Sequence, residues 1–97
     1  MIKKSLTKKV NGGKLFRVDI GFEDEIKEIK ITGDFFMHPE DLITEIEKSL
    51  IGLNINSSQE NILEILEDDF NNILYNLIGL SFEDLSDAIV EVLSENE

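Results

Sequence analysis

The first third of the chain alternates apolar and polar positions with a period of two. The alternation runs through residues 2–10, 14–22 and 26–33, and it is typical of strands that bury one face. Between the first two runs, Asn11-Gly12-Gly13 is a tight-hairpin signal, and Glu23-Asp24-Glu25 forms a polar turn before the third. We therefore expect three antiparallel strands, at about residues 2–10, 14–22 and 26–33, that share one apolar face.

The apolar positions then change to helical spacing. A first helix is expected to start at His38-Pro39-Glu40-Asp41, where proline suits the first turn and acids favour the helix dipole, and to stop at Gly52. A second starts at the capping box of Ser57-Ser58-Gln59-Glu60 and runs, weakened or bent at Asn71-Asn72, to Gly79. The expected buried positions of these two helices are Leu42, Ile43, Ile46, Leu50, Ile62, Leu63, Leu66, Phe70, Ile73, Leu74, Leu77 and Ile78.

A third helix is expected to open at Ser81-Phe82-Glu83-Asp84, where Leu80 and Leu85 have the spacing of a hydrophobic staple. Because strands come first and helices follow, the predicted fold class is α+β: a three-stranded antiparallel sheet with three helices packed on one face. We expect residues 1–97 to form a single domain, with the strands in residues 1–33 and the helices in residues 38–97. The buried stripe of the third helix is Leu85, Ala88, Ile89 and Val92.

Composition removes several classes of protein. The absence of cysteine excludes disulfides, thiolate metal sites and cysteine nucleophiles. A net charge of −12 argues against binding to nucleic acid or to an anionic membrane. No apolar run is long enough to span a bilayer, and none follows Lys3 and Lys4 as a secretory signal requires, so we expect a cytoplasmic protein. The charge is uneven, since residues 1–17 hold six of the nine bases and no acid.

Catalytic patterns are missing from the sequence. The single histidine, His38, precedes a proline at the expected helix start, where it serves either capping and surface packing or a functional contact. The acidic runs at residues 23–25 and 67–69 lack the spaced ligands and the glycine of a calcium loop. We therefore predict no catalytic residue and no metal site in this chain.

Two segments are candidates for binding. Asn11-Gly12-Gly13-Lys14 is either a simple hairpin turn or an anion-binding turn built from exposed amides and a lysine, although it lacks the Walker spacing. In Gly33-Asp34-Phe35-Phe36-Met37, Phe35 continues the apolar phase and is expected in the core. Phe36 and Met37 then point elsewhere, so one of them is a candidate for partner contact, with core packing as the alternative.

Several motifs together resemble the C-terminal accessory domain of lipoate–protein ligases, in order over about residues 8–93. The most specific of them is the turn Gly33-Asp34-Phe35-Phe36 followed by His38-Pro39-Glu40. The motifs are Gly13-Lys14-Leu15, Gly33-Asp34-Phe35-Phe36, His38-Pro39-Glu40, Ile78-Gly79-Leu80-Ser81 and Glu83-Asp84-Leu85.

This resemblance implies a role inside an enzyme. In that family a larger catalytic domain binds lipoate and ATP, forms lipoyl-adenylate and transfers the lipoyl group to a lysine of an acceptor protein, while the small domain is needed for adenylate formation. This chain begins at Met1 and lacks the catalytic domain's Arg-Arg and triple-glycine motifs, which is similar to the two-subunit form. The expected partner is a catalytic ligase subunit that holds ATP, Mg²⁺ and lipoate, and this chain alone is expected to bind no cofactor and to be inactive. The family's fold also resembles sulfur-relay and iron–sulfur scaffold proteins, which work through cysteine.

The alternative is a free-standing acidic interaction module unrelated to lipoylation. Such a module has no reason to concentrate six bases in residues 1–17 or to keep Gly33 before two phenylalanines. The candidate partner-interface or nucleotide-proximal residues are Gly12, Gly13, Lys14, Arg17, Gly33, Asp34, Phe36, Met37 and His38.

Overall fold

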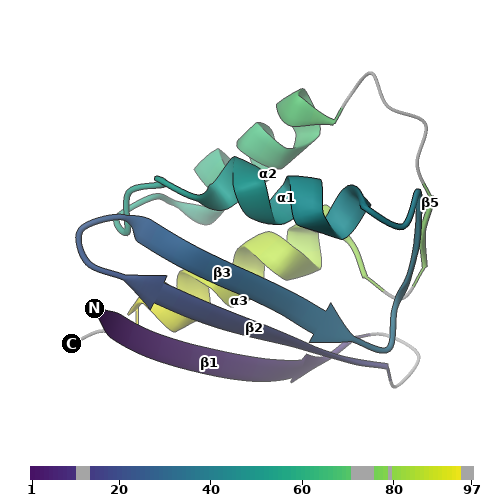
Figure 1. The fold of residues 1–97 in the computed structure, drawn as a ribbon, viewed down its shortest axis with the longest axis horizontal. Helices are drawn as coiled ribbons and strands as arrows, with labels where there is room; N and C mark the ends of the chain where they lie inside the picture. Colours follow the sequence, from purple (N-terminus) through teal and green to yellow (C-terminus); the bar gives the residue numbers. More distant parts are fainter. Residues whose placement is uncertain (11–13, 71–75, 79, 95–97) are drawn as a thin grey trace.

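A three-stranded antiparallel sheet forms one layer of the molecule (Figure 1). The computed structural model describes residues 1–10, 14–70, 76–78 and 80–94, with the backbone alone for 76–78. The strand order is β1-β2-β3, the order of a meander, as the alternation predicted. The strands are β1 (Ile2–Lys9), β2 (Leu15–Phe22) and β3 (Ile26–Gly33).

Three helices cover one face of this sheet and leave the other face open (Figure 1). Helix α1 (Leu42–Leu50) packs along β3, and α3 (Phe82–Ser94) packs against β1 and β2. Helix α2 (Gln59–Asp69) packs against the other two helices. Among the described residues, no helix is long and apolar enough to cross a membrane.

The core lies between the sheet and the helices. The even-numbered residues of β2, from Phe16 to Phe22, point toward the helices and are at most 2% exposed. Alternation therefore places every second side chain of the central strand in the core. The helical side chains of the same cluster are Leu42, Ile46, Leu50, Ile62, Leu66, Phe82, Leu85, Ala88, Ile89, Val92 and Leu93.

A second, two-stranded sheet corrects the expected second helix. Helix α2 ends at Asp69, and β5 (Asn76–Ile78) pairs antiparallel with β4 (Phe36–His38), so the prediction that Leu77 and Ile78 are helical is wrong. Apolar residues at helical spacing do not identify a strand that exists through pairing with a distant segment. The expected bend at Asn71-Asn72 and the stop at Gly79 lie outside the described residues.

The start of α1 also differs from the expectation. His38 ends β4, the His38–Pro39 peptide bond is cis, and the helix begins only at Leu42. Pro39 therefore lies in the turn before the helix, where its carbonyl accepts a hydrogen bond from the Leu42 amide at 3.0 Å. Strand pairing holds residues 36–38 extended, which postpones the first helical turn.

The other two helices begin where the sequence signals predicted, but the residue that caps α2 is Ser58 and not Ser57 of the expected Ser57–Glu60 capping box. Ser57 Oγ donates to the Asn54 carbonyl instead. Ser58 caps α2 by accepting a hydrogen bond from the Asn61 amide at 3.1 Å. At α3 the Asp84 amide donates to Ser81 Oγ at 3.0 Å, and the Ser81 amide donates to Asp84 Oδ2 at 3.2 Å. This reciprocal pair is a capping box, and it fixes where the last helix begins.

Candidate functional site

The candidate segments converge at one end of the sheet, which we call the hairpin end. Strand register places Phe16 opposite Gly33, and the Asp34 amide donates to the Leu15 carbonyl at 2.8 Å. The turn after β3 therefore lies against the start of β2, and β4 continues directly from it (Figure 1). The N-terminus and the last turn of α3 lie at the opposite end of the molecule (Figure 1).

Gly33 makes this close approach possible. A Cβ atom there would lie 2.5 Å from the Leu15 carbonyl oxygen and 2.6 Å from Phe16 Cα, both of them backbone atoms. Its φ of +150° is also a conformation that side chains disfavour. Glycine at this position therefore allows the turn to pack directly on β2.

Apolar side chains are exposed at the hairpin end. Phe36 is 56% exposed and Leu15 is 46% exposed, whereas Met37 is only 7% exposed and belongs to the core. Phe35 is half-buried and packs against the core, as its phase predicted. Of the two residues that the sequence left open, Phe36 therefore faces solvent and Met37 does not.

Leu15 belongs to this surface but is not among the candidates that the sequence suggested. It lies on the phase of β2 whose other members are Arg17, Asp19 and Gly21, and it is the one large apolar side chain of that phase. An apolar residue on the polar phase of a strand was the signal that could have identified it.

The charged candidates differ in how freely they present their charge. Arg17 is held by Asp19: its Nε lies 3.0 and 3.1 Å from the two carboxylate oxygens, and its Nη2 lies 3.0 Å from Oδ1. Lys14 is exposed and has no acidic partner among the described residues. Lys14 is therefore the candidate whose charge is available to an anion.

Asp19 is the centre of a small polar cluster on the open face. Ser5 on β1 donates a hydrogen bond to Asp19 Oδ1, and Arg17 binds the same carboxylate. The hydrogen bond from Ser5, and secondly Arg17, lower the pKa of Asp19 below its ordinary value. The carboxylate is thus held ionised as the link between β1 and β2.

The remaining candidates lie at the hairpin end or outside the described residues. Asp34 and His38 are both exposed, and His38 closes the short strand that carries Phe36. Gly12 and Gly13, with the question of a phosphate-binding turn, lie outside the described residues. The hairpin is closed just inside them by a 2.8 Å hydrogen bond from the Val10 amide to the Lys14 carbonyl.

The basic N-terminal segment is partly neutralised by the rest of the domain. Lys3 pairs with Glu28 at 3.2 Å, Lys8 with Glu91 at 3.1 Å, and Arg17 with Asp19. Within the ranges that the structure describes, the segment's other three bases have no acidic partner. These three are Lys4, Lys9 and Lys14.

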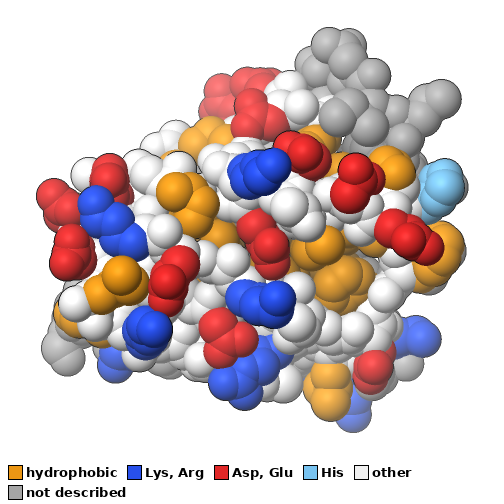
Figure 2. Space-filling model, viewed as in Figure 1, with side chains coloured by type: hydrophobic (Ala, Val, Ile, Leu, Met, Phe, Trp, Pro, Cys, Tyr) orange, Lys and Arg blue, Asp and Glu red, His pale blue; other side chains and the backbone are white. Residues whose placement is uncertain are grey.

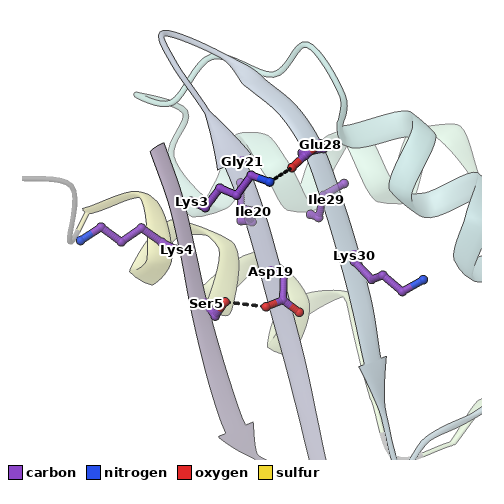
Figure 3. A pocket seen from close by; sticks show the side chains of 9 residues that line it. All are labelled: Lys3, Lys4, Ser5, Asp19, Ile20, Gly21, Glu28, Ile29 and Lys30. Atoms are coloured by element: carbon purple, nitrogen blue, oxygen red, sulfur yellow. Dashed lines mark hydrogen bonds and ion pairs between the residues drawn. The ribbon is translucent and has the colours of Figure 1, made fainter. Parts of the chain in front are cut away.

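A hollow of about 380 Å³ lies on the open face of the sheet, over Gly21 (Figure 3). Lys3 and Glu28 reach across the glycine to each other, and Ser5 bonds to Asp19 beside them (Figure 3). Most polar groups of this hollow therefore satisfy one another, and Lys30 points away from it (Figure 3). Such a hollow offers no cluster of unpaired polar groups aimed at a ligand.

The exposed surface is suited to contact with a protein. Figure 2 shows basic and acidic side chains interspersed over the face in view, with hydrophobic side chains exposed at the end that also carries the one histidine. Among the described residues no group of three or more histidine or carboxylate side chains is placed to hold a metal ion. An exposed aromatic, an exposed leucine and a lysine without an acidic partner among the described residues lie together at this end of the sheet. Such a combination is typical of protein-docking surfaces. The fold is that of a small α+β domain, and this surface is its candidate docking surface.

Comparison with known proteins identifies its family. The profile of the family described as "Bacterial lipoate protein ligase C-terminus" matches residues 3–89. The chain belongs to this family, and the resemblance carried by the Gly-Asp-Phe-Phe and His-Pro-Glu motifs is confirmed.

A curated relative and a solved structure are similar to the chain. The protein named lipoate-protein ligase A subunit 2, from Thermoplasma acidophilum, is 45% identical over 58 residues, which are 59% of this chain and 57% of that protein. The chain thus spans a little over half the length of this curated relative.

The solved structure is described as an archaeal lipoylation system, a bi-partite lipoate protein ligase and its E2 lipoyl domain from the same organism. One of its chains superposes with a TM-score of 0.73 at 35% identity, covering 91% of this chain and 94% of that one. This match confirms the predicted fold class of a three-stranded antiparallel sheet with three helices. A free-standing acidic module unrelated to lipoylation is not favoured.

Proposed function

We propose that this chain is the small accessory subunit of a two-component lipoate–protein ligase, and that it is required for the ATP-dependent activation of lipoate to lipoyl-adenylate. The observation that carries the proposal is the similarity, over nearly the full length of both chains, to a chain of a bi-partite ligase structure. The family membership over residues 3–89 supports the same role.

In this proposal the chain contributes no catalytic group of its own. The catalytic subunit binds ATP, Mg²⁺ and lipoate, and a lipoyl-acceptor protein meets the catalytic subunit rather than this one. We also propose a cytoplasmic location for the assembly. Adenylate formation is impaired by water, so a rigid domain that closes over the reaction site helps by exclusion and by positioning. A domain of this kind needs one face that docks and a contact weak enough to release.

The hairpin end is the docking surface in this proposal. Phe36 is the large exposed side chain of β4, and an exposed aromatic ring that becomes buried on binding often dominates the affinity of an interface. Leu15 lies on the adjoining strand and extends the apolar area. Pairing of β4 with β5 holds Phe36 in place before the partner arrives, which reduces the ordering cost of binding.

Calorimetric titration of the catalytic subunit with Phe36→Ala tests the docking surface. We expect the variant to bind at least about tenfold more weakly, as loss of a central aromatic contact requires. Ile51→Ala is the matched control, because Ile51 is also an exposed apolar residue, 46% exposed, and lies beside the start of β3 at the other end of the sheet. Equal weakening by both variants, or by neither, would contradict the assignment of the hairpin end.

We further propose that Lys14 faces the nucleotide bound by the catalytic subunit. Its charge is free of described acidic partners, whereas Arg17 is occupied by Asp19. In the reconstituted pair, Lys14→Ala should reduce lipoate-dependent pyrophosphate exchange, while Lys27→Ala, at the far end of the sheet beside Glu25, should leave it unchanged. Unchanged exchange in Lys14→Ala would show that this lysine has no such role.

A further inference from the structure

The outer edge of β1 is unpaired among the residues that the structure describes. The Val10 amide donates to the Lys14 carbonyl, so Val10 and Lys14 form a hydrogen-bonded pair of the β1–β2 ladder. In an antiparallel ladder such pairs recur at every second residue. The even-numbered residues of β1 therefore bond to β2. The amides and carbonyls that point outward are those of Lys3, Ser5, Thr7 and Lys9.

The opposite edge of the sheet is covered in part by the chain itself. The outward amide of Ile31 on β3 donates to Glu47 Oε2 of α1 at 2.8 Å. At the start of β3, Ile26 bonds through its amide to the Leu53 carbonyl and through its carbonyl to the Gly52 amide, both at 2.8 Å. The β3 edge is therefore bonded at Ile26 and Ile31, whereas no such bond is formed along the β1 edge among the described residues. The β1 edge is eight residues long without a bulge or a proline.

The open edge carries a charge pattern that selects its occupant. Lys9 lies on the open face of β1 and Lys4 on the helix face, and neither has an acidic partner among the described residues. Lys3 and Lys8 are paired with Glu28 and Glu91, so one unpaired positive charge remains on each side of a strand added there. A second copy of the chain would bring a second row of lysines against the first, and like charges disfavour that pairing. An acidic segment is favoured by the same charges.

We propose that the edge of β1 is a strand-addition site for an acidic, extended segment of the catalytic subunit. The identity of the occupant rests on the proposed function. The position of the edge supports this occupant, because the β1 edge is continuous with the proposed docking surface. Lys9 is opposite Leu15 in the register, so a segment paired along β1 leads directly to the hairpin end. Main-chain hydrogen bonds would supply the affinity, and the lysine side chains would supply specificity for an acidic segment.

The discriminating variant is Thr7→Pro. Proline removes an outward amide that makes no bond to the described residues, and edge strands tolerate proline at such positions. Thr7→Ala keeps the amide and is the matched control. In titrations with the catalytic subunit, Thr7→Pro should bind at least about tenfold more weakly than the wild-type chain, and Thr7→Ala within about twofold of it.

The outcomes separate this proposal from the proposed function. No binding of the catalytic subunit by the wild-type chain would overturn the proposed function and this occupant with it. Equal binding by wild type and Thr7→Pro would overturn the strand-addition site alone. A dimer of the isolated chain in sedimentation that Thr7→Pro abolishes would assign the edge to a second copy instead.

Hydrogen exchange supplies a readout that does not depend on any variant. The amides of Lys3, Ser5, Thr7 and Lys9 should exchange rapidly in the isolated wild-type chain and slow markedly in the complex. A double variant, Lys4→Glu with Lys9→Glu, tests the contribution of charge and should weaken binding at least about tenfold. Lys48→Glu on α1 is the control. Unslowed exchange of all four amides in the complex would overturn the proposal.

Discussion

Gly33 determines how closely the turn after β3 approaches β2. Its φ of +150°, and the short distances that a Cβ atom would have to the backbone at Leu15 and Phe16, leave no room for a side chain. The period-two pattern indicated that a strand ends here. The atoms that crowd Gly33 became known only from the register of β2 and β3, which pairs Phe16 with Gly33.

Gly33→Ala should therefore destabilise the domain by about 2–4 kcal/mol, because backbone strain and the displacement of backbone atoms both contribute. Gly52→Ala is the matched control: Gly52 has a φ of +90°, but a Cβ atom there would have no neighbour within 4 Å, so strain alone should cost about 1 kcal/mol. Urea denaturation measures both values. A Gly33→Ala cost no larger than that of Gly52→Ala would contradict the close contact.

The lowered pKa of Asp19 predicts that the stability of the domain depends on pH. The hydrogen bond from Ser5 and the charge of Arg17 lower the pKa of Asp19 in the folded state. The stability that Asp19 contributes is therefore complete above the pKa of this residue in the unfolded chain, about 3.9. It is lost as the pH falls through the lower, folded-state value. In Ser5→Ala the pKa of Asp19 should rise toward its ordinary value, as a carboxyl-detected NMR titration measures. The same titration midpoint in both proteins would show that Ser5 does not hold this carboxylate.

At the scale of elements, sequence patterns located the secondary structure better than the pairing between segments. The three strands of the main sheet fall within one residue of their predicted bounds, because one buried face imposes a strict alternation. Strands β4 and β5 were not predicted, because each is three residues long and is defined by its partner. The convergence of Leu15, Asp34 and Phe36 depends on that pairing and on the register, which no local pattern specifies.

Glu47 tests how the β3 edge is closed. Removal of its carboxylate in Glu47→Ala leaves the partly buried Ile31 amide without its acceptor, and should cost about 1–2 kcal/mol. The amide of Ile31 should then exchange with solvent faster. Glu45→Ala is the control on the same helix, since its pair with Lys48 is exposed and 3.9 Å long, and should change stability by less than about 0.5 kcal/mol. Unaltered exchange at Ile31 in Glu47→Ala would contradict this role.

At the scale of the whole molecule, the two ends of the sheet differ in what they present. At the end near the N-terminus, Ile26 is bonded to residues 52–53. The hairpin end exposes Phe36 and Leu15, beside Lys14, which has no acidic partner among the described residues. The net charge of −12 did not indicate which end of the sheet is a candidate binding surface. It arises mainly from the helical region, because residues 38–97 hold 15 of the 21 acids. The local excess of bases in residues 1–17 was the more useful signal, although three of these six bases are paired within the described structure.

The central proposal is that this chain enables a catalytic subunit to activate lipoate. The most direct measurement is the formation of lipoyl-adenylate from lipoate and ATP by the purified catalytic subunit, with and without an equimolar amount of this chain. We expect little adenylate from either protein alone and a large stimulation when they are combined, together with co-elution as a complex. Adenylate formation at the same rate with and without this chain, and no co-elution, would contradict the proposal.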